Sequence, residues 1–124
     1  MRPRVARRDR RFVVVDDHDA PEILRGHLAP VDAAPAHGEQ HLTLVATRSF
    51  AVGEILTGAL DAPVDFDQDH DEWVLVISGR ATLELDDRRH ELVAGDWLFL
   101  PARRRHRLVR AESGTRWLTV TGPR

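Results

Sequence analysis

Cysteine, lysine and tyrosine are absent from this chain of 124 residues. Without cysteine there is no disulfide framework, no thiolate metal site and no cysteine nucleophile, so any metal must bind through histidine, carboxylate or amide groups. Without lysine and tyrosine, Schiff-base chemistry and proton donation by a tyrosine are excluded as well. Long apolar runs are also missing, since no segment approaches the roughly 18 residues of a membrane-spanning helix.

The length and composition fit one small domain. A chain of this size buries roughly two-thirds of its unfolded surface, and a hydrophobic content of 42% is sufficient for such a core. The chain opens on the basic stretch Met1 to Arg4, with no apolar signal core behind it. We therefore expect a cytoplasmic protein with no membrane partner.

Every basic side chain apart from histidine is an arginine, and six arginines fall within the first eleven residues. Such a cluster can serve as a nucleic-acid-binding arm. No aromatic residue interleaves with it before Phe12, however, so stacking on bases has little support. We expect residues 1–11 to form a basic, disordered, solvated arm, and we do not expect a nucleic-acid partner.

Residues 12–40 are predicted to form an N-terminal extension. Phe12–Val15 is a short β-like run, and residues 20–27 are compatible with a helical turn. Residues 29–39 are rich in proline and alanine and are predicted to be a connection.

The rest of the chain, residues 41–124, has the pattern of an all-β domain. Apolar, β-branched segments at 42–47 and 50–57 precede an acidic stretch at 61–70 that we expect to be an irregular loop. Six further short segments follow, bounded by turn residues, at 73–77, 81–85, 90–93, 97–100, 106–109 and 116–121. Short strands at this spacing predict a sandwich or barrel.

The strand that begins at Glu72 has apolar residues on both faces. Since side chains alternate along a strand, Val74 and Val76 share the face of Glu72. The opposite face carries Trp73, Leu75 and Ile77. One face would line a barrel interior, and the other must be covered by the second sheet, the N-terminal segment or another subunit. We take a homodimer as the working hypothesis.

Two spaced motifs in this half resemble those of the cupin superfamily. In the first, Glu72 is followed by six residues and then Gly79. In the second, Gly95 is followed by five residues and Pro101, with His106 five positions later. The resemblance implies a small single-domain bacterial cupin with the double-stranded β-helix, or jelly-roll barrel, of that family.

The resemblance also implies a metal site, although two of its usual ligands are changed. Cupins typically hold a divalent metal with three histidines and one glutamate, and this chain keeps Glu72 and His106. Phe66 and Gln68 stand where the other two histidines would fall. Gln68 can still bind a metal through its amide oxygen, whereas Phe66 cannot.

Spacing adds one further candidate ligand. Gln68, His70 and Glu72 are two residues apart and would project to one face of an extended segment. His106, from a distant strand, would complete the set. Such a site, with water in its remaining positions, suits Fe(II), Mn(II), Ni(II) or Zn(II).

The second motif departs from the family pattern too, with Arg103 in place of its glycine and Arg110 in place of its asparagine. Arg110 shares the alternation of His106 and is expected to point into the barrel, where its guanidinium would bind an anionic group of a substrate. A surface salt bridge to Glu112 or Glu84 is the alternative. The remaining histidines lack ligand spacing and are expected at the surface: His18, His27, His37, His41 and His90.

Two functions from different classes follow. The first is a metal-binding cupin, a small metalloenzyme of dioxygenase, isomerase, lyase or cyclase type that acts on an organic metabolite. The second is a non-catalytic cupin that binds or senses a small molecule. Fold alone does not separate them.

Overall fold

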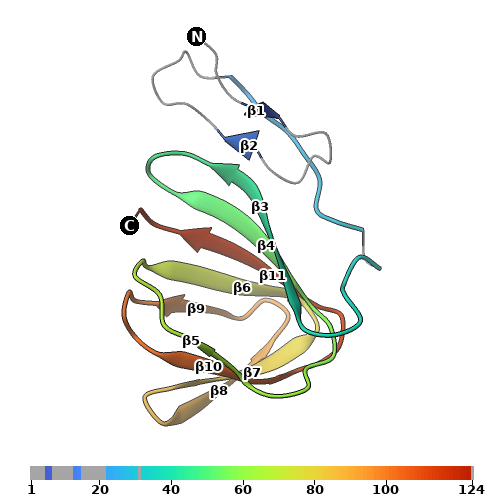
Figure 1. The fold of residues 1–124 in the computed structure, drawn as a ribbon, viewed down its shortest axis with the longest axis vertical. Coiled ribbons are helices and arrows are strands. Elements are labelled where there is room, and N and C mark those ends of the chain that lie inside the picture. Colours follow the sequence, from blue (N-terminus) through green and yellow to red (C-terminus); the bar gives the residue numbers. More distant parts are fainter. Residues whose placement is uncertain (1–4, 7–12, 15–21, 31, 124) are drawn as a thin grey trace.

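The computed structural model describes residues 5–6, 13–14, 22–30 and 32–123, which form two β-sheets (Figure 1). The strands are β1 (Val5–Ala6), β2 (Val13–Val14), β3 (Glu39–Ala46), β4 (Ala51–Thr57), β5 (Val64–Phe66), β6 (Glu72–Ser78), β7 (Arg80–Leu85), β8 (Arg88–Val93), β9 (Trp97–Leu100), β10 (His106–Ala111) and β11 (Thr115–Thr121). The seven-stranded sheet has the order β1-β2-β3-β4-β11-β6-β9, and the four-stranded sheet the order β5-β10-β7-β8. The predicted all-β jelly-roll is confirmed.

Each strand predicted between residues 42 and 121 is present, with ends that shift by a few residues. β3 begins earlier than predicted, at Glu39, and the acidic stretch predicted as a loop contains the short strand β5. Asp86 and Asp87 have φ values of 51° and 64° in the β7–β8 hairpin, as expected for a two-residue turn of the type that matches strand twist. No helix that could cross a membrane occurs in the described ranges.

The N-terminal extension differs from its prediction. Residues 22–30 contain no helical turn, so that prediction is wrong for its described part. The segment gains no burial, while the chain just beyond it is fixed by tertiary hydrogen bonds. The backbone of Ala29 donates to Glu54 Oε2 at 3.1 Å and accepts from Arg116 Nη2 at 2.6 Å, and Ile23 gains no burial that would reward a helix.

Only part of the predicted β-run and basic arm can be compared with the structure. Val13–Val14 form β2, which pairs antiparallel with β1 and parallel with β3. Phe12 and Val15 lie outside the described residues, as does the arm of residues 1–11 apart from the two residues of β1.

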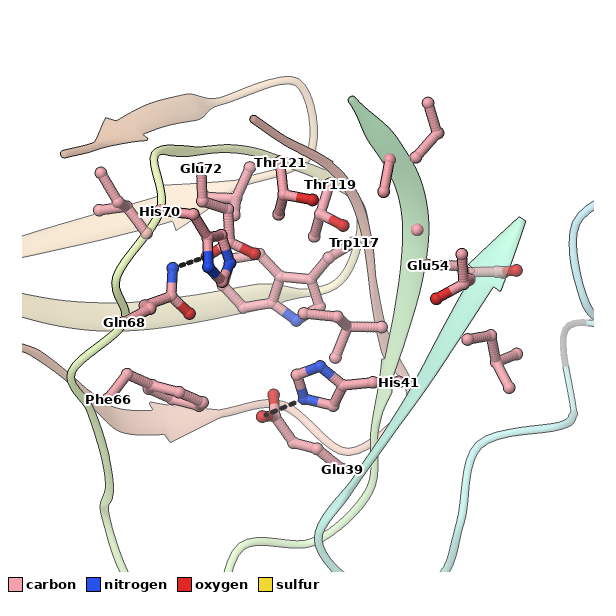
Figure 2. A pocket seen from close by; sticks show the side chains of 18 of the residues that line it. Glu39, His41, Glu54, Phe66, Gln68, His70, Glu72, Trp117, Thr119 and Thr121 are labelled. Atoms are coloured by element: carbon pink, nitrogen blue, oxygen red, sulfur yellow. Dashed lines mark hydrogen bonds and ion pairs between the residues drawn. The ribbon is translucent and has the colours of Figure 1, made fainter. Parts of the chain in front are cut away.

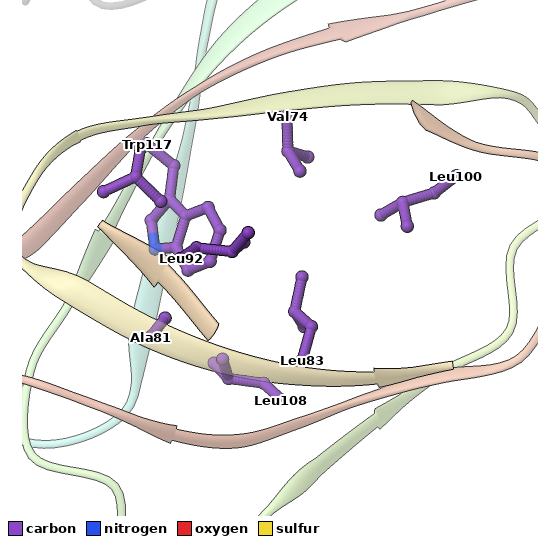
Figure 3. Close-up of a cluster of buried hydrophobic side chains, with 8 residues drawn as sticks. Val74, Ala81, Leu83, Leu92, Leu100, Leu108 and Trp117 are labelled. Carbon is purple, nitrogen blue, oxygen red and sulfur yellow. The ribbon is translucent and has the colours of Figure 1, made fainter. Parts of the chain in front are cut away.

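The hydrophobic core lies between the two sheets (Figure 3). The seven-stranded sheet contributes Val74, Val76, Leu100 and Trp117, and the four-stranded sheet contributes Ala81, Leu83, Leu92 and Leu108. The predicted inward face of the strand after Glu72 is therefore confirmed. This core forms the floor on which the candidate site is built.

The other face of the same sheet carries an apolar surface that we call the outer patch: Trp73, Leu75, Trp97 and Phe99. Strand register places Trp73 opposite Phe99 and Leu75 opposite Trp97, so these side chains share one face. Trp97 and Phe99 are 58% and 53% exposed, and the Trp73 and Trp97 rings lie 6.2 Å apart. Large exposed apolar groups in one registered patch indicate an interaction surface.

Candidate functional site

A cavity of about 360 Å³ opens between the two sheets. Its floor consists of core side chains, among them Val74, Leu83, Leu100, Leu108 and Trp117. Its polar wall contains Glu39, His41, Gln68, His70, Glu72 and His106. An apolar floor beneath a few polar groups is the usual design of a small-molecule site.

Glu72 and Gln68 form the central polar pair of this wall. Glu72 begins β6 and faces inward with Val74, and its Oε1 accepts a hydrogen bond of 2.9 Å from Gln68 Nε2. His70 lies beside them (Figure 2), with a side chain only 16% exposed and its Nδ1 3.1 Å from Asp69 Oδ1. The structure thus brings three of the four predicted ligands to one side of the cavity.

Two hydrogen bonds donated by backbone amides attach this segment to the turn that precedes His106. The Ala102 amide donates to Asp71 Oδ1 at 2.9 Å, and the Arg103 amide donates to the Gln68 carbonyl at 2.7 Å. Arg103 has a φ of 62°, so it keeps the left-handed conformation suited to the glycine that the family has at this position. The turn therefore retains its shape despite the substitution.

His106 starts β10 and is only 6% exposed. Strand register places it opposite Phe66 of β5, and the two rings stack with centroids 5.2 Å apart and an interplanar angle of 13°. Its Nδ1 lies 3.3 Å from the Arg104 carbonyl, to which it donates when that nitrogen is protonated. In that tautomer Nε2 is the acceptor nitrogen of the ring.

A second carboxylate, which sequence reasoning missed, lies in the same cavity wall. Glu39 Oε1 lies 3.4 Å from His41 Nε2, and Glu39 Oε2 accepts a hydrogen bond of 2.9 Å from Thr57 Oγ1. Thr57 in turn accepts from the Trp117 indole nitrogen at 3.1 Å. A chain of polar contacts therefore runs from the core to the cavity wall.

The hydrogen bond with Glu39 raises the pKa of His41; burial opposes this, and the charges of Glu39 and Glu72 add to the increase. His41 was expected at the surface, and its side chain is indeed 56% exposed, yet it also lines the cavity. The alternation of Glu39, His41 and Thr43 along one strand face is the signal that would have identified it.

The prediction that Arg110 points into the barrel is wrong. The β10–β7 register shifts between Leu108 and Arg110, and this β-bulge interrupts the alternation that began at His106. Leu108 remains in the core while Arg110 is exposed and does not line the cavity. Its alignment with His106 in the sequence therefore does not place its guanidinium at the site.

Glu54 belongs to a strand of the cavity wall, but its carboxylate points away from the cavity (Figure 2). On the outer face of the sheet its Oε1 accepts a hydrogen bond of 2.8 Å from Arg116 Nη2. The two side chains are 0% and 11% exposed. Glu54 and Arg116 therefore form a buried ion pair that holds Ala29, separate from the cavity.

The predicted metal ligands do not form a complete site in this arrangement. Within the described residues there is no group of three or more histidine, aspartate or glutamate side chains placed to hold a metal ion. Gln68 is hydrogen-bonded to Glu72 through its amide nitrogen, and His106 lies flat against Phe66. Among the predicted ligands, Glu72 and Gln68 are in direct contact with each other, whereas a typical cupin metal site has three or four ligands.

Comparison with known proteins agrees with the fold and motifs. A family model described as a cupin domain matches residues 51–121. A structure from Ralstonia eutropha, called a "putative mannose-6-phosphate isomerase", is 29% identical with a TM-score of 0.67, and the match covers 80% of this chain and 100% of that one. No match is found among functionally curated proteins.

Two more distant structures share the fold. The polyketide cyclase RemF of Streptomyces resistomycificus is 19% identical with a TM-score of 0.65, over 83% of this chain and 81% of that one. An RmlC-like cupin of Desulfovibrio desulfuricans is 16% identical with a TM-score of 0.65, over 82% and 98%. Two facing sheets around a polar-walled cavity form a jelly-roll fold of the cupin type. The chain belongs to the cupin family.

Proposed function

We propose that the cavity binds a small organic metabolite and that the Gln68–Glu72 pair is its main recognition element. The observation that carries this proposal is the hydrogen-bonded pair on the wall of a cavity with a hydrophobic floor. A polar pair in such surroundings gives a ligand orientation, while the apolar floor supplies contact area and excludes water. The established function of the family's proteins as binders of small molecules supports the same reading.

The binding geometry follows from the hydrogen-bonding capacity of the pair. One carboxylate oxygen of Glu72 accepts from Gln68, and a carboxylate has further acceptor positions. The Gln68 carbonyl oxygen is a second acceptor, and His70 and His106 offer ring nitrogens nearby. A ligand that enters between the sheets would place polar groups on this wall and its carbon skeleton on Leu83, Leu100 and neighbouring side chains.

An NMR titration with a metabolite library tests the proposal. Trp117 lines the cavity, so its indole N–H resonance responds to a ligand that enters. We expect at least one metabolite to shift this resonance, and Glu72→Ala to weaken its binding at least about tenfold. Arg110→Ala, on the outside, is the matched control and should bind as the wild type does. Equal affinity in wild type and Glu72→Ala would refute the assigned role.

A metalloenzyme is the second candidate function, because all four predicted ligands, Gln68, His70, Glu72 and His106, line one cavity. Members of the fold include proteins named as an isomerase and a cyclase. A bound Fe, Mn, Ni or Zn ion would supply Lewis-acid or oxygen-activating chemistry. Binding would require the side chains of His70, Glu72 and His106 to come closer together, since the described residues contain no group of three such side chains placed to hold a metal ion.

Elemental mass spectrometry on untagged protein separates this candidate from the first. Near-stoichiometric metal that is lost in both Glu72→Ala and His106→Ala would support a metal site. No metal in the wild type after reconstitution with each of the four ions would eliminate it and leave the binding function.

We also propose that the chain forms a homodimer through the outer patch. A two-fold dimer brings the same surface of both subunits together, so the surface must be self-complementary. A patch of Trp73, Leu75, Trp97 and Phe99 is compatible with this requirement, because it would bring no like charges together. Pairing of such sheet faces is a standard packing mode.

A further inference from the structure

We infer that the cavity selects ligands whose polar groups are neutral hydrogen-bond donors or cations, such as hydroxyl and ammonium groups, and discriminates against phosphates and carboxylates. This inference rests on the proposed binding function and specifies its ligand class.

The first support is the acceptor character of the cavity wall. Glu39 and Glu72 both line the cavity, and ionised carboxylates are acceptors only. Each carboxylate accepts one hydrogen bond from a neighbour: Gln68 donates to Glu72, and Thr57 donates to Glu39. Both carboxylates therefore have fixed positions, and a ligand must offer hydrogen-bond donors or positive charge to satisfy the remaining acceptor positions.

The second support is that no arginine of the described chain lines this cavity, and the sequence contains no lysine. Arg110 is turned outward by the bulge, and Arg116 is bound to Glu54 on the opposite face of the sheet. Arginine and lysine are the side chains that usually recognise phosphate and carboxylate groups. An anionic ligand would meet the carboxylates of Glu39 and Glu72, and no guanidinium of the described residues lines the cavity to offset them.

Four arginines line a separate groove on the other side of Phe66 and His106: Arg103, Arg104, Arg105 and Arg107. Three of them form salt bridges with aspartates: Arg104 with Asp86, Arg105 with Asp67 and Arg107 with Asp65. The fourth, Arg103, lines the groove and not the cavity. The charges of the three paired arginines are therefore balanced on the surface, and none of the four guanidinium groups lines the cavity.

The histidines of the cavity wall do not make the net charge of the cavity positive. The raised pKa of His41 favours its protonated form, but that charge is paired with Glu39. His70 contacts Asp69, and His106 contacts a backbone carbonyl. A protonated His41 therefore neutralises Glu39 and leaves Glu72 as the charge that an entering ligand meets.

A matched series of four probes tests the inference on chelator-treated protein. The probes are cyclohexylmethylamine, cyclohexylmethanol, cyclohexanecarboxylate and cyclohexylmethyl phosphate, which share one apolar body and differ in the charge of the polar group. Titration followed at the Trp117 indole resonance gives each dissociation constant. We expect the amine and the alcohol to bind at least about tenfold more tightly than the two anions.

Variants locate the source of the selectivity. Glu72→Gln keeps the side-chain shape, removes the charge, and should reduce the preference for amine over carboxylate at least about threefold. Arg110→Gln, outside the cavity, should leave it unchanged. Tighter binding of either anion than of the alcohol would overturn the inference while leaving the cavity as a binding site. Absence of binding by all four probes at millimolar concentration would overturn the proposed function and the inference with it.

Discussion

Glu54 and Glu72 stand on strands of the same sheet, but their side chains point to opposite faces and have different surroundings. Glu54 is completely buried and neutralised by Arg116. Glu72 faces the cavity, and the amide of Gln68 donates to it. A buried carboxylate with a charged partner holds structure together, whereas one with a neutral partner keeps its charge for a ligand. The partner, more than the residue type, indicates which carboxylate is functional.

The largest expected change in stability comes from breaking the ion pair of Glu54 and Arg116. Arg116→Met leaves the carboxylate of Glu54 buried without its charged partner, which should lower the free energy of unfolding by about 3–5 kcal/mol. Urea unfolding followed by tryptophan fluorescence measures it. The double variant Arg116→Met/Glu54→Leu should regain most of the loss. A loss no greater than that from Arg89→Met, whose 3.5 Å pair with Glu84 is largely exposed, would contradict the structural role.

Next in size is the effect of the outer patch on association. If Trp97 is central to the dimer, Trp97→Ser should weaken association by about 2–4 kcal/mol, the usual range for a buried aromatic anchor. Sedimentation velocity over a concentration series shows whether dimer gives way to monomer. Arg88→Ser, on the exposed end of β8, serves as the control. A wild type that is monomeric at high concentration would refute the dimer.

The hydrogen bonds that connect Glu39, Thr57 and Trp117 should make an intermediate contribution to stability. Thr57→Val keeps the side-chain volume but removes the bond to Glu39 and leaves the Trp117 indole N–H without its acceptor. We expect a loss of about 1–3 kcal/mol of stability, measured by urea unfolding. Thr43→Val, in the same cavity wall, should change stability less. An equal loss in both variants would contradict the importance of these hydrogen bonds.

The smallest expected effect is a pH dependence from His41. Since its pKa is raised in the folded state, the stabilisation is fully present below the unfolded value of 6.5 and is lost as the pH rises through the higher folded value. Because the side chain is 56% exposed, solvent screening limits the effect to under about 1 kcal/mol. The difference in unfolding midpoint between wild type and His41→Gln should shrink as the pH rises above 6.5. A difference that is constant with pH would contradict the pairing.

The strands and their inward face could be predicted because alternation and turn residues are local signals. Val74 and Val76 were placed correctly on this basis. Arg110 was misplaced because a β-bulge depends on how two strands pair, which local alternation does not encode. Glu39 and His41 were missed because the predicted strand began at residue 42, whereas β3 begins at Glu39, so the alternation that includes them was not recognised.

The hydrogen bonds that tie Ala29 to Glu54 and Arg116 also indicate the smallest fragment of this chain that should fold. The family match starts at residue 51, but Glu54 and Arg116 inside that region share their hydrogen bonds with a residue more than twenty positions before it. A fragment cut at residue 51 would lack β3 as well and would expose the edge of β4. We therefore expect the chain around Ala29 to belong to the folding unit of the barrel, and a truncation that preserves the barrel to begin upstream of Ala29.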